Sequence, residues 1–182
     1  MANYEKKSIV KGSPCSTKCK RIEEAVGELL IEKKLSVSVA ESCTGGLVGH
    51  LITNVPGSSV YFMGGVTAYT NEAKVTLLDV SCEIIKKFGA VSDHVVCQMA
   101  RNVRRLFNSN IGIAVSGIAG PGGGSLEKPV GTVYIGLNVA DNSWSQRYLF
   151  KGSRQQIKQY TAETALELIR RYLNGDSFIS CV

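Results

Sequence analysis

The chain has 182 residues, 44% hydrophobic and 20% charged, and no apolar run approaches the roughly 18 residues that cross a membrane. Its first twenty residues lack the apolar segment of a secretory signal, so we expect a cytoplasmic protein with no membrane partner. The net charge is +6, but residues 1–21 contribute +5 of it, which leaves the remaining chain without the clustered basic surface that nucleic acid would need.

We interpret residues 1–20 as a flexible basic arm, residues 21–175 as a single domain and residues 176–182 as a short tail. Within the domain, apolar residues at helical spacing or in alternation predict helices and strands in turn. The predicted elements are a helix at 22–34, a strand at 36–40, a helix at 47–52, strand character at 60–69, helices at 71–78, 81–88 and 96–107, strands at 111–115, 131–139 and 144–150, and a helix at 153–173. Helices that alternate with strands and end in a hairpin predict an α/β fold, a three-layer α/β/α sandwich with a mixed β-sheet.

The turn between the first strand and the second helix is the first candidate site. Ser42 follows the strand at the point where the free N–H groups of the next helix are expected. This position suits a nucleophile whose reaction forms an oxyanion, and Gly45 and Gly46 let a substrate approach the backbone. Two alternatives stay open: Ser42 or Thr44 is only a helix cap, or Cys43 is the nucleophile, because a helix N-terminus lowers the pKa of a thiol.

The second candidate site is the glycine-rich loop SGIAGPGGG at 116–124, which follows a predicted buried strand. Successive backbone N–H groups in such a loop can bind a phosphate. The loop matches neither the phosphate-binding loop of nucleotide hydrolases nor the dinucleotide fingerprint. Anion binding and a plain connection therefore both remain open.

Lys74 breaks a local rule. If Asn71 caps its helix, Lys74 lies in the first turn, where the helix dipole disfavours a cation. A lysine whose charged form is disfavoured can act as a neutral base, although a surface lysine that extends into water is the alternative. His50 and His94 have no neighbours that support a Ser-His-Asp triad.

Metal and disulfide chemistry are not indicated. Cys15 and Cys19 are spaced like a pair of metal ligands, but the other cysteines and both histidines are scattered along the chain. A chain of this length without a secretory signal is also not typical of a disulfide scaffold. We expect no metal and no cofactor.

Together these segments resemble the C-terminal domain of the competence/damage-inducible CinA proteins, a family that includes nicotinamide-nucleotide amidases. The matching stretches are AESCTGG (40–46), PGSS (56–59), GGVTAYTNEAK (64–74), GAVS (89–92), SGIAGPGGG (116–124), EKPVGTVY (127–134) and KGSR (151–154). Two positions depart from the usual pattern: Gly122 stands where the family commonly has Asp, and Asp79 stands where Gly is usual.

The resemblance implies hydrolysis of the carboxamide of nicotinamide mononucleotide, giving nicotinate mononucleotide and ammonia. Ser42 resembles the nucleophile and Lys74 its general base. Tyr69 resembles a residue that holds or activates this pair. Ser116 matches a hydroxyl-bearing family position, and Arg154 matches a phosphate-binding arginine.

The residues and the resemblance together predict the remaining contacts. Backbone N–H groups at Thr44, Gly45 and Gly46 are expected to stabilise the oxyanion, and the loop that includes Gly117 and Gly120 is expected to hold the phosphate. The alternative function is a nucleotide-binding or regulatory module without turnover. By analogy with the family, a homodimer is expected.

Overall fold

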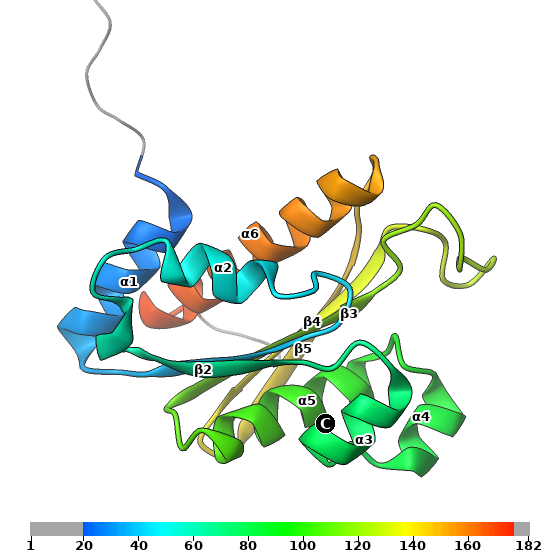
Figure 1. Cartoon of the computed structure of the whole chain (residues 1–182), viewed down its shortest axis with the longest axis horizontal. Coiled ribbons are helices and arrows are strands. Elements are labelled where there is room, and N and C mark those ends of the chain that lie inside the picture. Colours follow the sequence, from blue (N-terminus) through cyan, green and yellow to red (C-terminus); the bar gives the residue numbers. More distant parts are fainter. Residues whose placement is uncertain (1–19, 177–182) are drawn as a thin grey trace, which may run out of the picture.

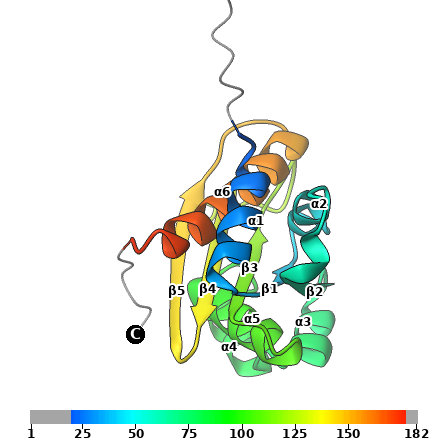
Figure 2. The ribbon, with the colours of Figure 1, turned by 90° about the vertical axis from the view of Figure 1, so that its left-hand side faces the viewer.

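The structure is a computed structural model that describes residues 20–176. The predicted basic arm, except Lys20, and residues 177–182 of the predicted tail lie outside the described residues, as does the Cys15 and Cys19 pair. A five-stranded sheet has helices on both faces (Figures 1 and 2), which confirms the predicted three-layer sandwich with a mixed sheet.

The sheet has the strand order β2-β1-β3-β4-β5. Strand β1 (Val37–Glu41) lies between β2 (Phe62–Thr67) and β3 (Ile111–Gly117) and is parallel to both. The hairpin of β4 (Thr132–Val139) and β5 (Asn142–Leu149) continues the sheet from β3 in antiparallel fashion. The carboxyl ends of β1, β2 and β3 therefore meet at one edge, the usual ligand-binding position in such sheets.

The helices divide between the two faces of the sheet and lie above and below it in Figure 1. One face carries α1 (Ile22–Lys33), α2 (Leu47–Thr53) and α6 (Arg154–Leu173). The other carries α3 (Asn71–Leu78), α4 (Cys82–Phe88) and α5 (Asp93–Leu106), and a short 3₁₀ turn at Ser58–Val60 precedes β2. None of the helices within residues 20–176 is long and apolar enough to span a membrane.

The two faces are packed with side chains of different size. Large aliphatic residues of β1, β3 and β4 pack against α1 and α6, whereas the side toward α5 presents alanines and glycines together with Tyr134. A Cβ on Gly112 would collide with the carbonyl oxygen of Ala100, and one on Gly136 would lie 2.6 Å from that of Val96. Glycine is therefore required at these two positions for α5 to lie directly on the sheet.

All five residues of strand β1 are buried, although serine and valine alternate in its sequence. A central parallel strand has covered faces on both sides, so polar residues in it need internal partners. Ser38 has one, since its hydroxyl lies 2.7 Å from that of Ser109. The alternation of serine and valine thus marks a strand with two buried faces rather than one exposed face.

Candidate active site

Three segments that are distant in the sequence meet where β1, β2 and β3 end. The backbone N–H of Ser42 donates to the carbonyl of Val115 (3.1 Å), and that of Ala68 donates to the carbonyl of Glu41 (2.8 Å). These two bonds extend the parallel ladders by one residue beyond the strands. As a result, the turn that carries Ser42 is joined to the chain on both sides.

Lys74 lies on α3 and extends its amine back into this edge of the sheet. Its Nζ is 3.0 Å from Ser42 Oγ, 3.0 Å from the Ala68 carbonyl oxygen and 3.5 Å from that of Thr70. The side chain is only 2% exposed. Burial lowers the pKa of Lys74, and the nearby Cys43 and Glu72 side chains only partly oppose this shift.

The N-cap of α3 is Thr70, so the prediction that Asn71 caps this helix is wrong. The Thr70 hydroxyl accepts the N–H of Ala73 at 3.1 Å, and Asn71 is the first helical residue. Both residue types cap helices well, and the extended backbone of Thr70 decides between them. Lys74 remains within the first turn, and its backbone N–H donates to the Thr70 carbonyl.

A cavity of about 240 Å³ encloses the Ser42 and Lys74 side chains. Six of the ten predicted site residues line it: Ser42, Tyr69, Lys74, Ser116, Gly117 and Arg154. Ala119, from the predicted glycine-rich loop, also lines the cavity, as do Asn71, Ala90 and Val91, which the sequence did not indicate as site residues. The only sequence signal for Asn71, Ala90 and Val91 was that all three lie within the stretches that carry the family resemblance.

Arg154 joins three segments at the rim of this cavity. It is the first residue of α6, and its guanidinium donates to the Tyr69 hydroxyl and to the Gly120 carbonyl, each at 2.7 Å. Gly120 therefore contacts the site through Arg154 instead of lining the cavity. A guanidinium has five N–H donors, so further donors of Arg154 remain for an anion.

Ser116 contributes a hydroxyl with a defined orientation. Its Oγ donates to the Ala90 carbonyl at 2.8 Å, because a carbonyl can only accept. The lone pairs of Ser116 are thus left to accept a hydrogen bond from a molecule in the cavity. Lys128 Nζ donates to the Phe88 carbonyl at 2.8 Å, two residues before Ala90, and so holds this segment of the chain.

The N–H groups of the turn are mostly occupied, which contradicts the predicted oxyanion contacts at Gly45 and Gly46. Gly45 donates to the Ser42 carbonyl (3.2 Å), and Gly46 donates to the Glu41 carboxylate (2.9 Å). Thr44 is fully buried, does not line the cavity, and its hydroxyl has no hydrogen-bond partner among the described residues. The alternative that Ser42 or Thr44 caps α2 is also wrong, because Gly46 is the N-cap.

The sequence reasoning missed the role of Glu41 as a hydrogen-bond acceptor for α2. Its carboxylate also accepts the N–H groups of Val48 (3.1 Å) and Gly49 (2.8 Å). An acid next to a glycine-rich helix start was the available signal, since helix N-termini favour negative charge. The sequence does not show which way a side chain five residues before the cap points.

The alternative nucleophile and bases are less suitable. Cys43 also lines the cavity, but it is only 6% exposed and burial raises the pKa of its thiol to about 12. His50 contacts Asn54, and His94 pairs with Asp93; neither histidine lines the cavity. Between residues 20 and 176, no three His, Cys, Asp or Glu side chains are grouped as metal ligands.

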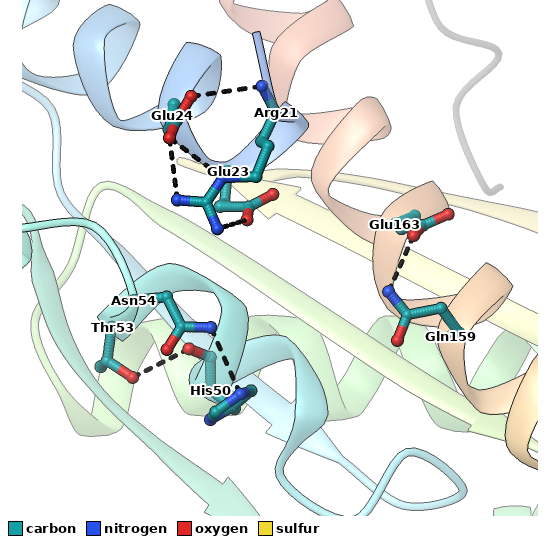
Figure 3. Close-up of polar contacts among 8 residues, drawn as sticks. All are labelled: Arg21, Glu23, Glu24, His50, Thr53, Asn54, Gln159 and Glu163. Carbon is teal, nitrogen blue, oxygen red and sulfur yellow. Dashed lines mark hydrogen bonds and ion pairs between the residues drawn. The ribbon is translucent and has the colours of Figure 1, made fainter.

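A larger hollow of about 540 Å³ lies between α1, α2 and α6 and contains no predicted site residue. Several of its polar side chains pair with one another. Arg21 pairs with Glu23 (3.3 Å), and the Gln159 amide donates to Glu163 (2.7 Å), as Figure 3 shows. It holds no serine hydroxyl beside a buried amine, whereas the smaller cavity does, so the smaller cavity is the candidate site.

Asp79 stands where the family usually has Gly, and its backbone conformation accounts for that usual residue. It is the C-cap of α3 and has a φ of 48°, a left-handed conformation that favours glycine. This explains why the family pattern has Gly there. Gly122 faces open space, since a Cβ on it would meet no atom within 4 Å.

Comparison with known proteins gives one consistent family. The profile described as the CinA C-terminal domain matches residues 19–173. A CinA-like protein of Desulfotalea psychrophila is 46% identical over 155 residues, which are 85% of this chain and 38% of that protein. A protein of Moorella thermoacetica described as a putative competence-damage inducible protein is 49% identical over 154 residues, 85% of this chain and 37% of its own length. The chain thus spans well under half the length of these curated relatives.

Solved structures agree with this comparison. A competence/damage inducible protein of Agrobacterium tumefaciens is 40% identical, with a TM-score of 0.79 over 84% of this chain and 95% of that one. A CinA superfamily protein of Klebsiella pneumoniae is 29% identical, with a TM-score of 0.82 over 84% of this chain and 96% of that one.

Proposed function

The chain belongs to the CinA C-terminal domain family, and we propose that it is an amidase that hydrolyses nicotinamide mononucleotide to nicotinate mononucleotide and ammonia. Ser42 is the nucleophile and Lys74 its general base. The observation that carries the proposal is the 3.0 Å contact between Lys74 Nζ and Ser42 Oγ inside a cavity where the amine is buried. Buried titratable groups beside a nucleophile are typical of reactive sites.

An ammonium at Lys74 donates to all three surrounding oxygens, and a neutral amine keeps the contacts if the Ser42 hydroxyl donates to it instead. A neutral amine has two N–H donors and one lone pair, and the carbonyl oxygens of Ala68 and Thr70 accept two N–H groups. The lone pair is then directed at the Ser42 hydroxyl. Because burial lowers the pKa of Lys74, this neutral form is accessible at lower pH than for an exposed lysine.

In the proposed reaction, Lys74 takes the proton of Ser42 while Oγ attacks the carboxamide carbon. The tetrahedral intermediate collapses, the C–N bond breaks, and Lys74 returns the proton to the departing ammonia. A water molecule then attacks the acyl-serine, with Lys74 again as the base, and releases the carboxylate product. We assign one oxyanion contact to the backbone N–H of Cys43, the residue after the nucleophile, because Gly45 and Gly46 are already occupied.

The cavity walls suit the parts of this substrate. Ala90, Val91 and Ala119 present small apolar surfaces to an aromatic ring. The free lone pairs of Ser116 can accept an N–H of the carboxamide, and the free donors of Arg154 at the rim can bind the phosphate.

Ammonia release from nicotinamide mononucleotide tests the proposal. We expect turnover by the wild type and a loss of about 10³-fold or more in kcat for Ser42→Ala. Ser59→Ala, an exposed serine outside the cavity, is the control and should retain full activity. A wild-type protein that binds the nucleotide but releases no ammonia would instead be a binding or regulatory module.

A further inference from the structure

Glu41 is a buried acid with a set of contacts that the proposed chemistry does not use. It directly precedes Ser42, is 2% exposed and does not line the cavity. Its carboxylate accepts three backbone N–H groups, those of Gly46, Val48 and Gly49, at 2.8–3.1 Å. Over residues 20–176 it forms no ion pair with a Lys, Arg or His side chain within 4.0 Å.

These contacts replace an ordinary helix cap. The N-cap of α2 is Gly46, which has a φ of 97° and no side chain to accept an N–H. Glu41 supplies the missing acceptor from five residues earlier, with both carboxyl oxygens at the N-terminal end of the helix. The carboxylate therefore bridges β1 and α2 across the turn that contains Ser42.

The turn is thus fixed at both ends. At its start, the Ala68 N–H donates to the Glu41 carbonyl (2.8 Å) and the Ser42 N–H donates to Val115 (3.1 Å). At its end, the Glu41 side chain holds Gly46 and the first residues of α2. Lys74 depends on the same frame, because its Nζ donates to the Ala68 carbonyl.

We infer that Glu41 is a positioning residue, whose carboxylate fixes the turn 42–46 so that Ser42 Oγ stays within hydrogen-bond distance of Lys74 Nζ. The inference rests on the proposed roles of Ser42 and Lys74. Lys74 is anchored by Ala68 and Thr70, whereas the direction of the Ser42 side chain depends on the turn. A displacement of about 1 Å between reacting groups can lower a rate about 100-fold.

Two substitutions separate the shape of the carboxylate from its charge. Glu41→Gln keeps the length but replaces one acceptor oxygen with an N–H₂ donor, which opposes a backbone N–H. Glu41→Asp keeps the charge but shortens the side chain, so that it no longer reaches all three N–H groups. We expect kcat to fall about 10- to 100-fold in Glu41→Gln and less in Glu41→Asp. KM should stay within about twofold in both, because Glu41 does not line the cavity.

Ser81→Ala is the matched control for lost capping. The Ser81 hydroxyl accepts the N–H of Ile84 (3.4 Å) at the start of α4, away from the cavity lining. This variant should lower the melting temperature without changing kcat. A purely structural role of Glu41 predicts the same result for its variants.

A second readout does not depend on the substrate. A fluorophosphonate labels a reactive serine: Ser42 Oγ bonds to phosphorus, fluoride leaves, and the hydroxyl proton passes to Lys74. Mass spectrometry measures the rate at which Ser42 is labelled. This rate should fall in Glu41→Gln by the same factor as kcat. If the wild type releases no ammonia, the proposed function fails, yet the labelling rates still test Glu41. An unchanged labelling rate in folded Glu41→Gln would overturn the inference. If Glu41→Gln does not fold, an unchanged labelling rate in Glu41→Asp would overturn it. An effect on KM alone would also overturn it.

Discussion

Two hollows of this molecule, one between α1, α2 and α6 and one at the strand ends, differ in size and in chemistry. The hollow between α1, α2 and α6 has about 540 Å³, against 240 Å³ for the cavity at the strand ends. In the larger one, charged groups such as Arg21 and Glu23 neutralise one another. The smaller one holds Lys74 in a setting that disfavours its charge, next to a serine hydroxyl. We therefore base the proposed reactive site on the buried amine beside a hydroxyl and not on volume.

Substitution of Lys74 should have the largest effect, because it removes the buried amine that distinguishes the smaller cavity. Lys74→Ala and Lys74→Arg should each lose about 10³-fold or more in kcat/KM, because guanidinium stays protonated and cannot accept the serine proton. In the wild type, kcat/KM should rise with pH below the ordinary lysine pKa of 10.5, as the lowered pKa of Lys74 is passed. Ammonia release measured from pH 6 to 10 tests both the loss of activity in the variants and the pH dependence of the wild type. Retained activity in Lys74→Arg would show that Lys74 acts as a fixed charge.

Arg154, at the rim of the small cavity, should favour substrates that carry a phosphate over those that lack one. Arg154→Ala should raise KM for nicotinamide mononucleotide about 10- to 100-fold, the scale of one charge-assisted contact. KM for nicotinamide riboside, which lacks the phosphate, should change much less. Steady-state kinetics with both substrates measures the difference. Equal losses on the two would give Arg154 a structural role, through its bonds to Tyr69 and Gly120.

The buried amine should also appear in the pH dependence of stability. The folded-state pKa of Lys74 lies below its unfolded value, so between these two values the unfolded chain binds more protons and stability rises with pH. Relative to Lys74→Met, the free energy of unfolding of the wild type should therefore increase as the pH rises toward 10.5. Urea unfolding of both proteins from pH 7 to 10.5 measures this, and the subtraction removes the opposing alkaline titration of Cys43. A constant difference would mean that Lys74 stays charged in the folded state.

A smaller effect is expected at Cys43. With a pKa of about 12, its thiol is almost wholly protonated at pH 8, so iodoacetamide should modify the exposed Cys82 and leave Cys43 unreacted. Cys43→Ala should retain kcat within about threefold, since the proposed oxyanion contact uses the backbone. Mass spectrometry of the alkylated protein and ammonia release test this. Loss of turnover on selective modification of Cys43, with Ser42→Ala still active, would make Cys43 the nucleophile.

The smallest effects should come from the larger hollow. Glu163→Gln should leave kcat and KM within about twofold and the free energy of unfolding within about 0.5 kcal/mol, as for most surface substitutions. Denaturant unfolding and the ammonia assay measure both quantities. A clear change in kcat would show that α6, which carries both Glu163 and Arg154, couples the two hollows.

Local patterns predicted the elements well and their junctions less well. The helix predicted at 153–173 is α6, Arg154–Leu173, and the strand predicted at 111–115 lies within β3, because apolar spacing is a property of a few adjacent residues. The cap of α3 was placed one residue late, since Thr70 and Asn71 have similar capping ability. Only the backbone conformation of Thr70 separates them.

The sequence by itself determined the order of elements, the family and the residues that we propose for the chemistry. Only the tertiary structure decided which of them meet. Ser42 and Lys74 are 32 residues apart, and Tyr69 and Arg154 are 85 apart, so each contact depends on how the strand ends align in the sheet. In the fold, the first N–H groups of α2 donate to the Glu41 carboxylate, so they are not available to an oxyanion. The direction of a buried side chain depends on packing from several elements, which spacing along one chain does not contain.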